Sequence, residues 1–242
     1  GRLYVEAEAG GERFIAVLDA AGEPLARYDF AGPLALDPTR GRLYVDRGAA
    51  GLAILDAADG QLLRTVELPA LPPNATRAPA PQADPTTGQV FAFRGTEMLT
   101  IDPQAGEIAD RVAFDLRPQD NCRQPHDAPL PVEGSHYDAG SRLLYLEFLS
   151  YVCTPWYGTT IVSYDVAAGA EVERGGAYPY EAVASDGYLF VSSNHRFGIG
   201  YVSQWRDGKP AVETSDWSGG ALPLAYDARR GRAYQAAGTT LR

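Results

Sequence analysis

The chain has 242 residues, of which 45% are hydrophobic and 21% are charged, and its net charge is −10. A chain of this size can bury a substantial core, and all-β domains of this length are common. The acidic balance argues against nucleic acid and anionic membrane surfaces as partners, because both require a cationic face. No apolar run reaches the roughly 18 residues of a transmembrane helix, so no membrane span is expected.

The phrase GRLYV occurs at Gly1–Val5 and returns at Gly41–Val45. Weaker copies lie at Gly88–Phe93, Ser141–Leu146, Asp186–Val191 and Gly231–Gln235. A recurrence of roughly 40 to 54 residues is typical of stacked supersecondary units. We expect the aromatic residue of each copy to lie in the core between neighbouring units, at Tyr4, Tyr44, Phe91, Tyr145, Phe190 and Tyr234.

The second copy contains the whole unit. Strand-like patterns cover Pro33–Asp37, Arg42–Asp46, Gly51–Gly60 and Gln61–Pro69, and turn residues such as PTRG separate them. Gly or Pro interrupts the chain about every ten residues, and no long segment has the helical period of 3.6 residues. The unit is therefore predicted as four antiparallel strands.

Repeats of four antiparallel strands at this spacing are typical of β-propeller blades, and the period is too long for a parallel β-helix. The pattern LYV…ILD…G…L…V resembles the YVTN family of β-propellers, relatives of the NHL and WD40-like groups, over nearly the whole chain. The predicted fold class is all-β, one propeller domain over 1–242. Its blades are expected at about 1–31, 32–69, 78–116, 134–177, 180–217 and, in part, 221–242. Such propellers serve many functions, so the resemblance implies the fold and not the activity.

The predicted strands do not divide into blades of four throughout the chain. About five blades are complete, and the chain ends carry partial blades. The first unit starts at its second strand, so six second strands accompany five fourth strands. One interpretation is a segment of a larger propeller of six to eight blades. The other closes a ring by pairing the last unit's first strand with the first unit's second strand. We favour the segment, because closure leaves the final GRAYQAAGTTLR without a place.

Two connections are long and irregular, at 117–135 and 148–159, and propeller topology places both on one face. Each contains one of the two cysteines, so we expect a Cys122–Cys153 disulfide. The alternative is two unrelated buried thiols. A disulfide implies an oxidising compartment, namely the periplasm, the cell surface or the extracellular medium. Lys209 is the only lysine, and this preference for arginine indicates a GC-rich, bacterial source.

The same face gathers aromatic and arginine residues, which are frequent in binding hot spots. The candidate ligand-binding residues are Arg123, Tyr151, Trp156, Tyr157, Tyr180 and Arg196. A candidate site for a divalent metal consists of His126, Asp127, His136 and His195, because imidazole and carboxylate groups are metal ligands. The ordinary alternative is that the aromatic residues cover the disulfide and the histidines lie on a polar rim.

No nucleophile elbow, P-loop or H-E-x-x-H motif occurs. The repeated aspartates recur in most copies and are therefore predicted to make turns rather than to catalyse, namely Asp19, Asp37, Asp56, Asp84, Asp102, Asp138, Asp165 and Asp227.

The prediction is a non-catalytic, extracytoplasmic scaffold that binds a protein or glycan on the face formed by 117–135 and 148–159. No cofactor is expected, and a bound divalent metal is kept as an alternative. The alternatives are a metal-dependent, lactonase-like hydrolase, the propeller subunit of a dehydrogenase, and a purely structural domain of a surface protein.

Overall fold

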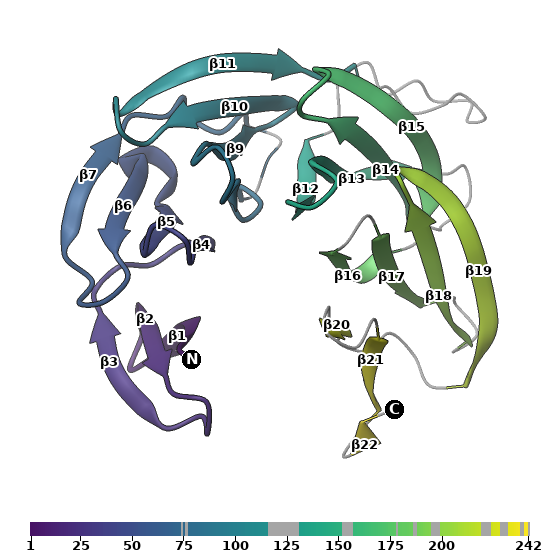
Figure 1. Ribbon diagram of the computed structural model, residues 1–242, viewed down its shortest axis with the longest axis horizontal. Helices are drawn as coiled ribbons and strands as arrows, with labels where there is room; N and C mark the ends of the chain where they lie inside the picture. Colours follow the sequence, from purple (N-terminus) through teal and green to yellow (C-terminus); the bar gives the residue numbers. More distant parts are fainter. Residues whose placement is uncertain are drawn as a thin grey trace. The chain divides into compact units, whose positions relative to one another are not determined.

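The computed structural model describes residues 1–73, 75, 77–115, 131–151, 157–177, 179–185, 188–194, 199–218, 224–227, 232–237 and 240–241. The chain divides into two compact units, Gly1–Phe114 and Asp115–Arg242, and each is described by itself. In the described ranges the chain is all-β, with one short 3-10 turn at Gly48–Ala50, and its strand pairings are antiparallel (Figure 1).

The first unit contains three sheets whose strands pair in chain order. The first sheet consists of β1 (Leu3–Ala9), β2 (Glu12–Leu18) and β3 (Pro24–Tyr28). The second consists of β4 (Leu34–Asp37), β5 (Arg42–Asp46), β6 (Leu52–Asp56) and β7 (Leu62–Val66). The third consists of β8 (Gln82–Ala83), β9 (Val90–Arg94), β10 (Glu97–Asp102) and β11 (Glu107–Ala113).

The second unit follows the same scheme in its described residues. Its first sheet consists of β12 (Val132–Asp138), β13 (Leu143–Tyr151), β14 (Tyr157–Asp165) and β15 (Ala170–Ala177). The next consists of β16 (Pro179–Ser185), β17 (Tyr188–Asn194), β18 (Ile199–Arg206) and β19 (Lys209–Ser218). The last consists of β20 (Leu224–Asp227), β21 (Arg232–Ala237) and β22 (Thr240–Leu241).

Successive sheets are arranged alike within each unit. The first strand of one sheet lies beside the first strand of the next, β4 beside β8 in the first unit. In the second unit β12 contacts β16, and β16 contacts β20. The second and third sheets of the first unit, and the three sheets of the second unit, therefore each contribute their first strand to a row of adjacent strands in their own unit.

The second sheet is buried on both faces, because successive side chains of a strand point to opposite sides. The cluster between the first and second sheets consists of Ile15, Val17, Tyr28, Leu43, Val45, Ala53, Leu55 and Ala57. The cluster between the second and third sheets consists of Tyr44, Leu52, Ile54, Val66, Val90, Ala92 and Ile101. Burial on both faces explains why β5 and β6 are almost continuously apolar.

The core position predicted for the repeated aromatic residue is confirmed for Tyr44, Phe91 and Tyr145, which are at most 1% exposed. Tyr4 is only partly buried and packs against the first cluster. The side chains of Phe190 and Tyr234 lie outside the described residues.

The repeated aspartates make turns, as predicted. Asp37 accepts hydrogen bonds from the backbone N–H groups of Thr39 and Arg40, at 2.9 and 3.1 Å. The same arrangement, in which a carboxylate accepts from amides two to four residues later, occurs at Asp19, Asp56, Asp84, Asp102, Asp138 and Asp165. The side chain of Asp227 lies outside the described residues.

In the second repeat the strands lie close to their predicted positions, and β5 begins and ends at the predicted residues. One expectation was wrong in extent. The connection expected over 148–159 is largely strand, because β13 continues to Tyr151 and β14 begins at Tyr157, and these two residues face each other in register. Aromatic and β-branched residues favour the pleated conformation, and here they extend the hairpin.

Gly51 is required by a close backbone approach. Its φ is +81°, and a Cβ at this position would overlap the carbonyl oxygen of Val66. Gly11 has nearly the same φ, +82°, with nothing within 4 Å of its Cβ position. Gly51→Ala is therefore expected to lower the free energy of unfolding by about 1–3 kcal/mol more than Gly11→Ala does. Urea denaturation of both variants measures this difference, and equal losses would contradict it.

Candidate functional site

Most residues that the sequence favours for binding lie outside the described residues. They are Cys122, Arg123, His126, Asp127, Cys153, Trp156, His195 and Arg196. Tyr151, Tyr157 and Tyr180 belong to β13, β14 and β16, but their side chains lie outside the described part. The disulfide, the ligand residues and the metal cluster therefore stay predictions.

His136 has a described partner in the adjacent strand. Its Nε2 atom lies 3.0 Å from Oε1 of Glu147, and the two side chains are 25% and 17% exposed. Gly134 faces Glu147 across the ladder, and a Cβ there would lie 2.5 Å from Glu147 Oε2. In the described ranges no group of three or more His, Cys, Asp and Glu residues is placed to hold a metal ion. His136 and Glu147 thus form a contact between neighbouring strands of one sheet.

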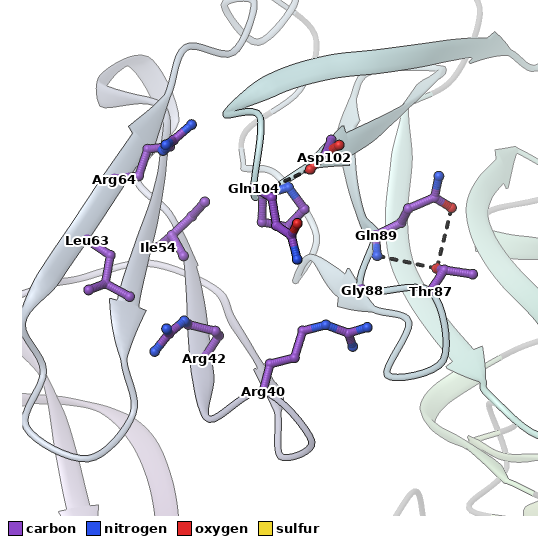
Figure 2. A pocket seen from close by; sticks show the side chains of 11 residues that line it. Arg40, Arg42, Ile54, Leu63, Arg64, Thr87, Gly88, Gln89, Asp102 and Gln104 are labelled. Carbon is purple, nitrogen blue, oxygen red and sulfur yellow. Dashed lines mark hydrogen bonds between the residues drawn. The ribbon is translucent and has the colours of Figure 1, made fainter.

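A cavity of about 700 Å³ opens between the second and third sheets of the first unit (Figure 2). The second sheet and its turns contribute Arg40, Arg42, Ile54, Leu63 and Arg64. The third sheet contributes Thr87, Gly88, Gln89, Asp102, Pro103 and Gln104. The cavity volume falls within the roughly 300–1,000 Å³ of small-molecule pockets. The cavity lies at the β4–β5, β8–β9 and β10–β11 turns, whereas sequence reasoning favoured the connections at the other strand ends.

The corresponding seam between the first and second sheets is lined by tyrosines. The hydroxyls of Tyr4 and Tyr28 both donate to the carbonyl of Ala57, at 2.7 and 3.1 Å. Arg2 donates to the carbonyl of Ala58 at 2.8 Å. Gly60 lies against the Tyr28 ring so closely that a Cβ would overlap it. Two phenol rings and a guanidinium therefore fill this seam.

The second seam differs at one of these positions, because Arg42 and Tyr44 repeat Arg2 and Tyr4. Val66 pairs with Leu52 as Tyr28 pairs with Ile15, so a valine replaces the tyrosine. Gly106, the counterpart of Gly60, lies against the Arg64 side chain instead of a ring. A charged side chain thus lies against Gly106, where an aromatic ring lies against Gly60, and a cavity is present at this seam.

The arginines of the cavity differ in their partners. Arg40 donates to Asp37 at 3.0 Å and to the Pro85 carbonyl at 2.8 Å. Arg42 donates to Asp56 at 2.8 Å. Arg64 donates to the carbonyl of Ala105, and no carboxylate of the described residues lies within ion-pair distance of it.

The carboxylates near the cavity already accept hydrogen bonds from backbone N–H groups of the turns. Asp102 accepts from the N–H groups of Gln104 and Ala105 at 2.7 and 3.0 Å. The N–H of Ala58, helped by Arg42, holds the pKa of Asp56 below its usual value, so its carboxylate is ionised. The walls therefore offer hydrogen-bond donors to the cavity, while much of the acceptor capacity is already used.

A buried ion pair joins the second and third sheets elsewhere. Arg94 Nη1 lies 2.6 Å from Oδ2 of Asp46, and Arg94 Nη2 lies 3.0 Å from Oδ1. Their side chains are 2% and 1% exposed. Arg94 Nε also donates to the carbonyl of Pro69 at 2.7 Å, which ties the β7–β8 connection to the pair. The sequence analysis predicted neither this pair nor the cavity. The local signal for the pair was Arg94, a charged residue at the end of the apolar strand β9.

A scan against protein-family models found no match, and a search of curated proteins found no significant match. No helix in the described part of the chain has the length and apolarity to cross a membrane. Function is therefore inferred from this chain's own residues.

Proposed function

We propose that the chain is a β-propeller of the kind that YVTN-type sequences form, and that it acts as a non-catalytic binding scaffold. Sheets of up to four consecutive antiparallel strands support the propeller, and so do the first strands that lie side by side, β4 with β8 in the first unit and β12, β16 and β20 in the second. The burial of the second sheet on both faces supports it too, because a blade packs between two neighbours.

The observation that carries the binding function is the cavity between the second and third sheets. It combines aliphatic surface from Ile54 and Leu63 with arginine and glutamine side chains. Ligand pockets typically pair apolar walls with a few fixed polar groups. These side chains recognise a ligand by contact area, charge and hydrogen bonds, which fits binding rather than catalysis.

The extracytoplasmic location and the second binding surface belong to the same proposal. That surface is formed by 117–135 and 148–159 and is joined by Cys122–Cys153. The long β13–β14 hairpin supports it, because Tyr151 and Tyr157 end its two strands. Arg123 and Trp156 would add to this surface.

A thermal-shift screen of small organic compounds, with hits checked by NMR titration, tests the proposal on four proteins. These are the wild type, Leu63→Trp, the matched control Leu25→Trp, and the triple variant Arg123→Ala, Trp156→Ala and Tyr157→Ala. Leu25 and Leu63 occupy the same bulged position on β3 and β7, and only Leu63 lines the cavity. We expect compounds that bind the wild type and L25W and lose binding in L63W.

Two other outcomes of the screen would contradict the expected result. Compounds lost only in the triple variant would place the site on the 117–135 and 148–159 surface instead. The binding function is overturned when no compound depends on either set of residues.

A further inference from the structure

We propose that the cavity between the second and third sheets takes an organic acid with more than one polar group, of which a carboxylate binds Arg64 and a second carboxylate or hydroxyl binds Arg42. This inference rests on the proposed binding function and adds the chemistry of the ligand. The observation behind it is the set of arginines that line the cavity and the donors that they leave unused.

The lining is rich in arginine, and the Arg64 guanidinium has no carboxylate partner among the described residues. The chain carries −10 overall, yet three arginines and one aspartate line the cavity. The described hydrogen bonds of Arg42 and Arg64 each use a single nitrogen, Nη1. A guanidinium offers several N–H donors in a planar fork, so both side chains retain donors for a ligand. Arg64 is exposed and has no carboxylate of the described residues as an ion-pair partner.

Two glycines hold the arginines in place. Gly88 lies under the Arg40 guanidinium, where a Cβ would come 2.6 Å from Cζ. Gly106 lies under Arg64, which also donates to the Ala105 carbonyl. A side chain that is already fixed loses less conformational freedom when a ligand binds, so these contacts favour affinity.

The walls favour an organic acid over an inorganic anion. The planar fork of arginine matches a carboxylate with two parallel hydrogen bonds. Ile54, Leu63 and Pro103 offer apolar surface to a carbon skeleton, which phosphate or sulfate lacks. Gln104 points toward the cavity from the opposite wall, and its amide suits a hydroxyl or a second carboxylate (Figure 2). A small hydroxy acid or dicarboxylate satisfies all three features.

Isothermal titration calorimetry at low ionic strength tests the assignment with citrate, succinate, glucuronate and inorganic phosphate as separate probes. We expect saturable binding of at least one carboxylate, weakened about tenfold to a hundredfold in Arg64→Gln and in Arg42→Gln, because each loses a charge-assisted hydrogen bond. Arg64→Lys keeps the positive charge but loses the planar fork of donors, so its affinity is expected to lie between those of the wild type and Arg64→Gln. Arg111→Gln is the control, because Arg111 is 52% exposed and lies outside the lining.

The other results overturn the assignment. Phosphate binding as tightly as the organic acids would mean an adventitious ion only. Carboxylate binding that is equally strong in R64Q and R111Q would place the acid elsewhere. Neutral compounds that depend on Leu63, with no binding of the four probes, would overturn the acid and leave the binding function standing. Circular dichroism of R64Q and R42Q confirms that the variants are folded.

Discussion

Asp46→Ala is expected to lower the free energy of unfolding by about 3–5 kcal/mol, because it leaves a buried charge without its partner. Arg94 would keep its guanidinium in a site where its side chain is only 2% exposed. It would also lose both bonds of the fork at once, while its bond to the Pro69 carbonyl still holds it in place. Urea unfolding followed by circular dichroism measures the loss.

The matched control for Asp46→Ala is an ion pair at the surface. Glu97 and Arg111 lie 3.8 Å apart with side chains 43% and 52% exposed, so Glu97→Ala is expected to change stability by less than about 1 kcal/mol. Adding Arg94→Met to Asp46→Ala removes the unpaired charge and is expected to recover part of the loss. A loss in Asp46→Ala as small as that in Glu97→Ala would show that the buried pair is not needed.

Tyr44→Ala is expected to lower the free energy of unfolding by about 3–5 kcal/mol, because it removes a large side chain from the core. Tyr44 is 1% exposed and lies in the cluster between the second and third sheets. Its counterpart in the preceding repeat, Tyr4, is only partly buried, so Tyr4→Ala is expected to lose less. The same urea titration compares the two variants, and a reversed order would contradict the packing described here.

The same tyrosine links stability to alkaline pH. Burial raises the pKa of Tyr44 to about 12, and it does the same for Tyr145. The pKa of an unfolded tyrosine is about 10, so the folded state favours the neutral phenol. This contribution is fully present below about pH 10 and is lost as the pH rises from about 10 to about 12. Tyr44→Phe is expected to flatten that decline, as measured by unfolding at several alkaline pH values.

The arrangement into strands could be predicted because its signals are local. An alternating strand such as Arg42–Asp46 and a turn aspartate such as Asp56 each act within a few residues, and both recur in most repeats. The connection at 148–159 was harder, because Cys153, Pro155 and Gly158 suggested a loop while the flanking aromatic and β-branched residues extended the hairpin.

The cavity could not be predicted, because it depends on residues from different repeats. Arg64 reaches the carbonyl of Ala105, 41 positions away, and Arg94 reaches Asp46, 48 positions away. Arg64 alone resembles an ordinary surface residue of an edge strand, and Arg94, which belongs to the buried pair and not to the cavity, resembles a charged residue that ends an apolar strand. Sequence reasoning gave weight to visible irregularity, whereas this site is built from short and regular turns.

The lining of the cavity is almost independent of the core. Of its residues only Ile54 belongs to one of the described core clusters, and the rest come from turns, from strand ends such as Arg42 and Asp102, and from the outer strand β7. Substitutions at Leu63, Gln89 or Gln104 therefore change what the cavity accepts without disturbing the packing that holds the sheets together. A site of this kind can diverge quickly in specificity, and it offers protein engineers a binding surface that can be redesigned on an unchanged framework.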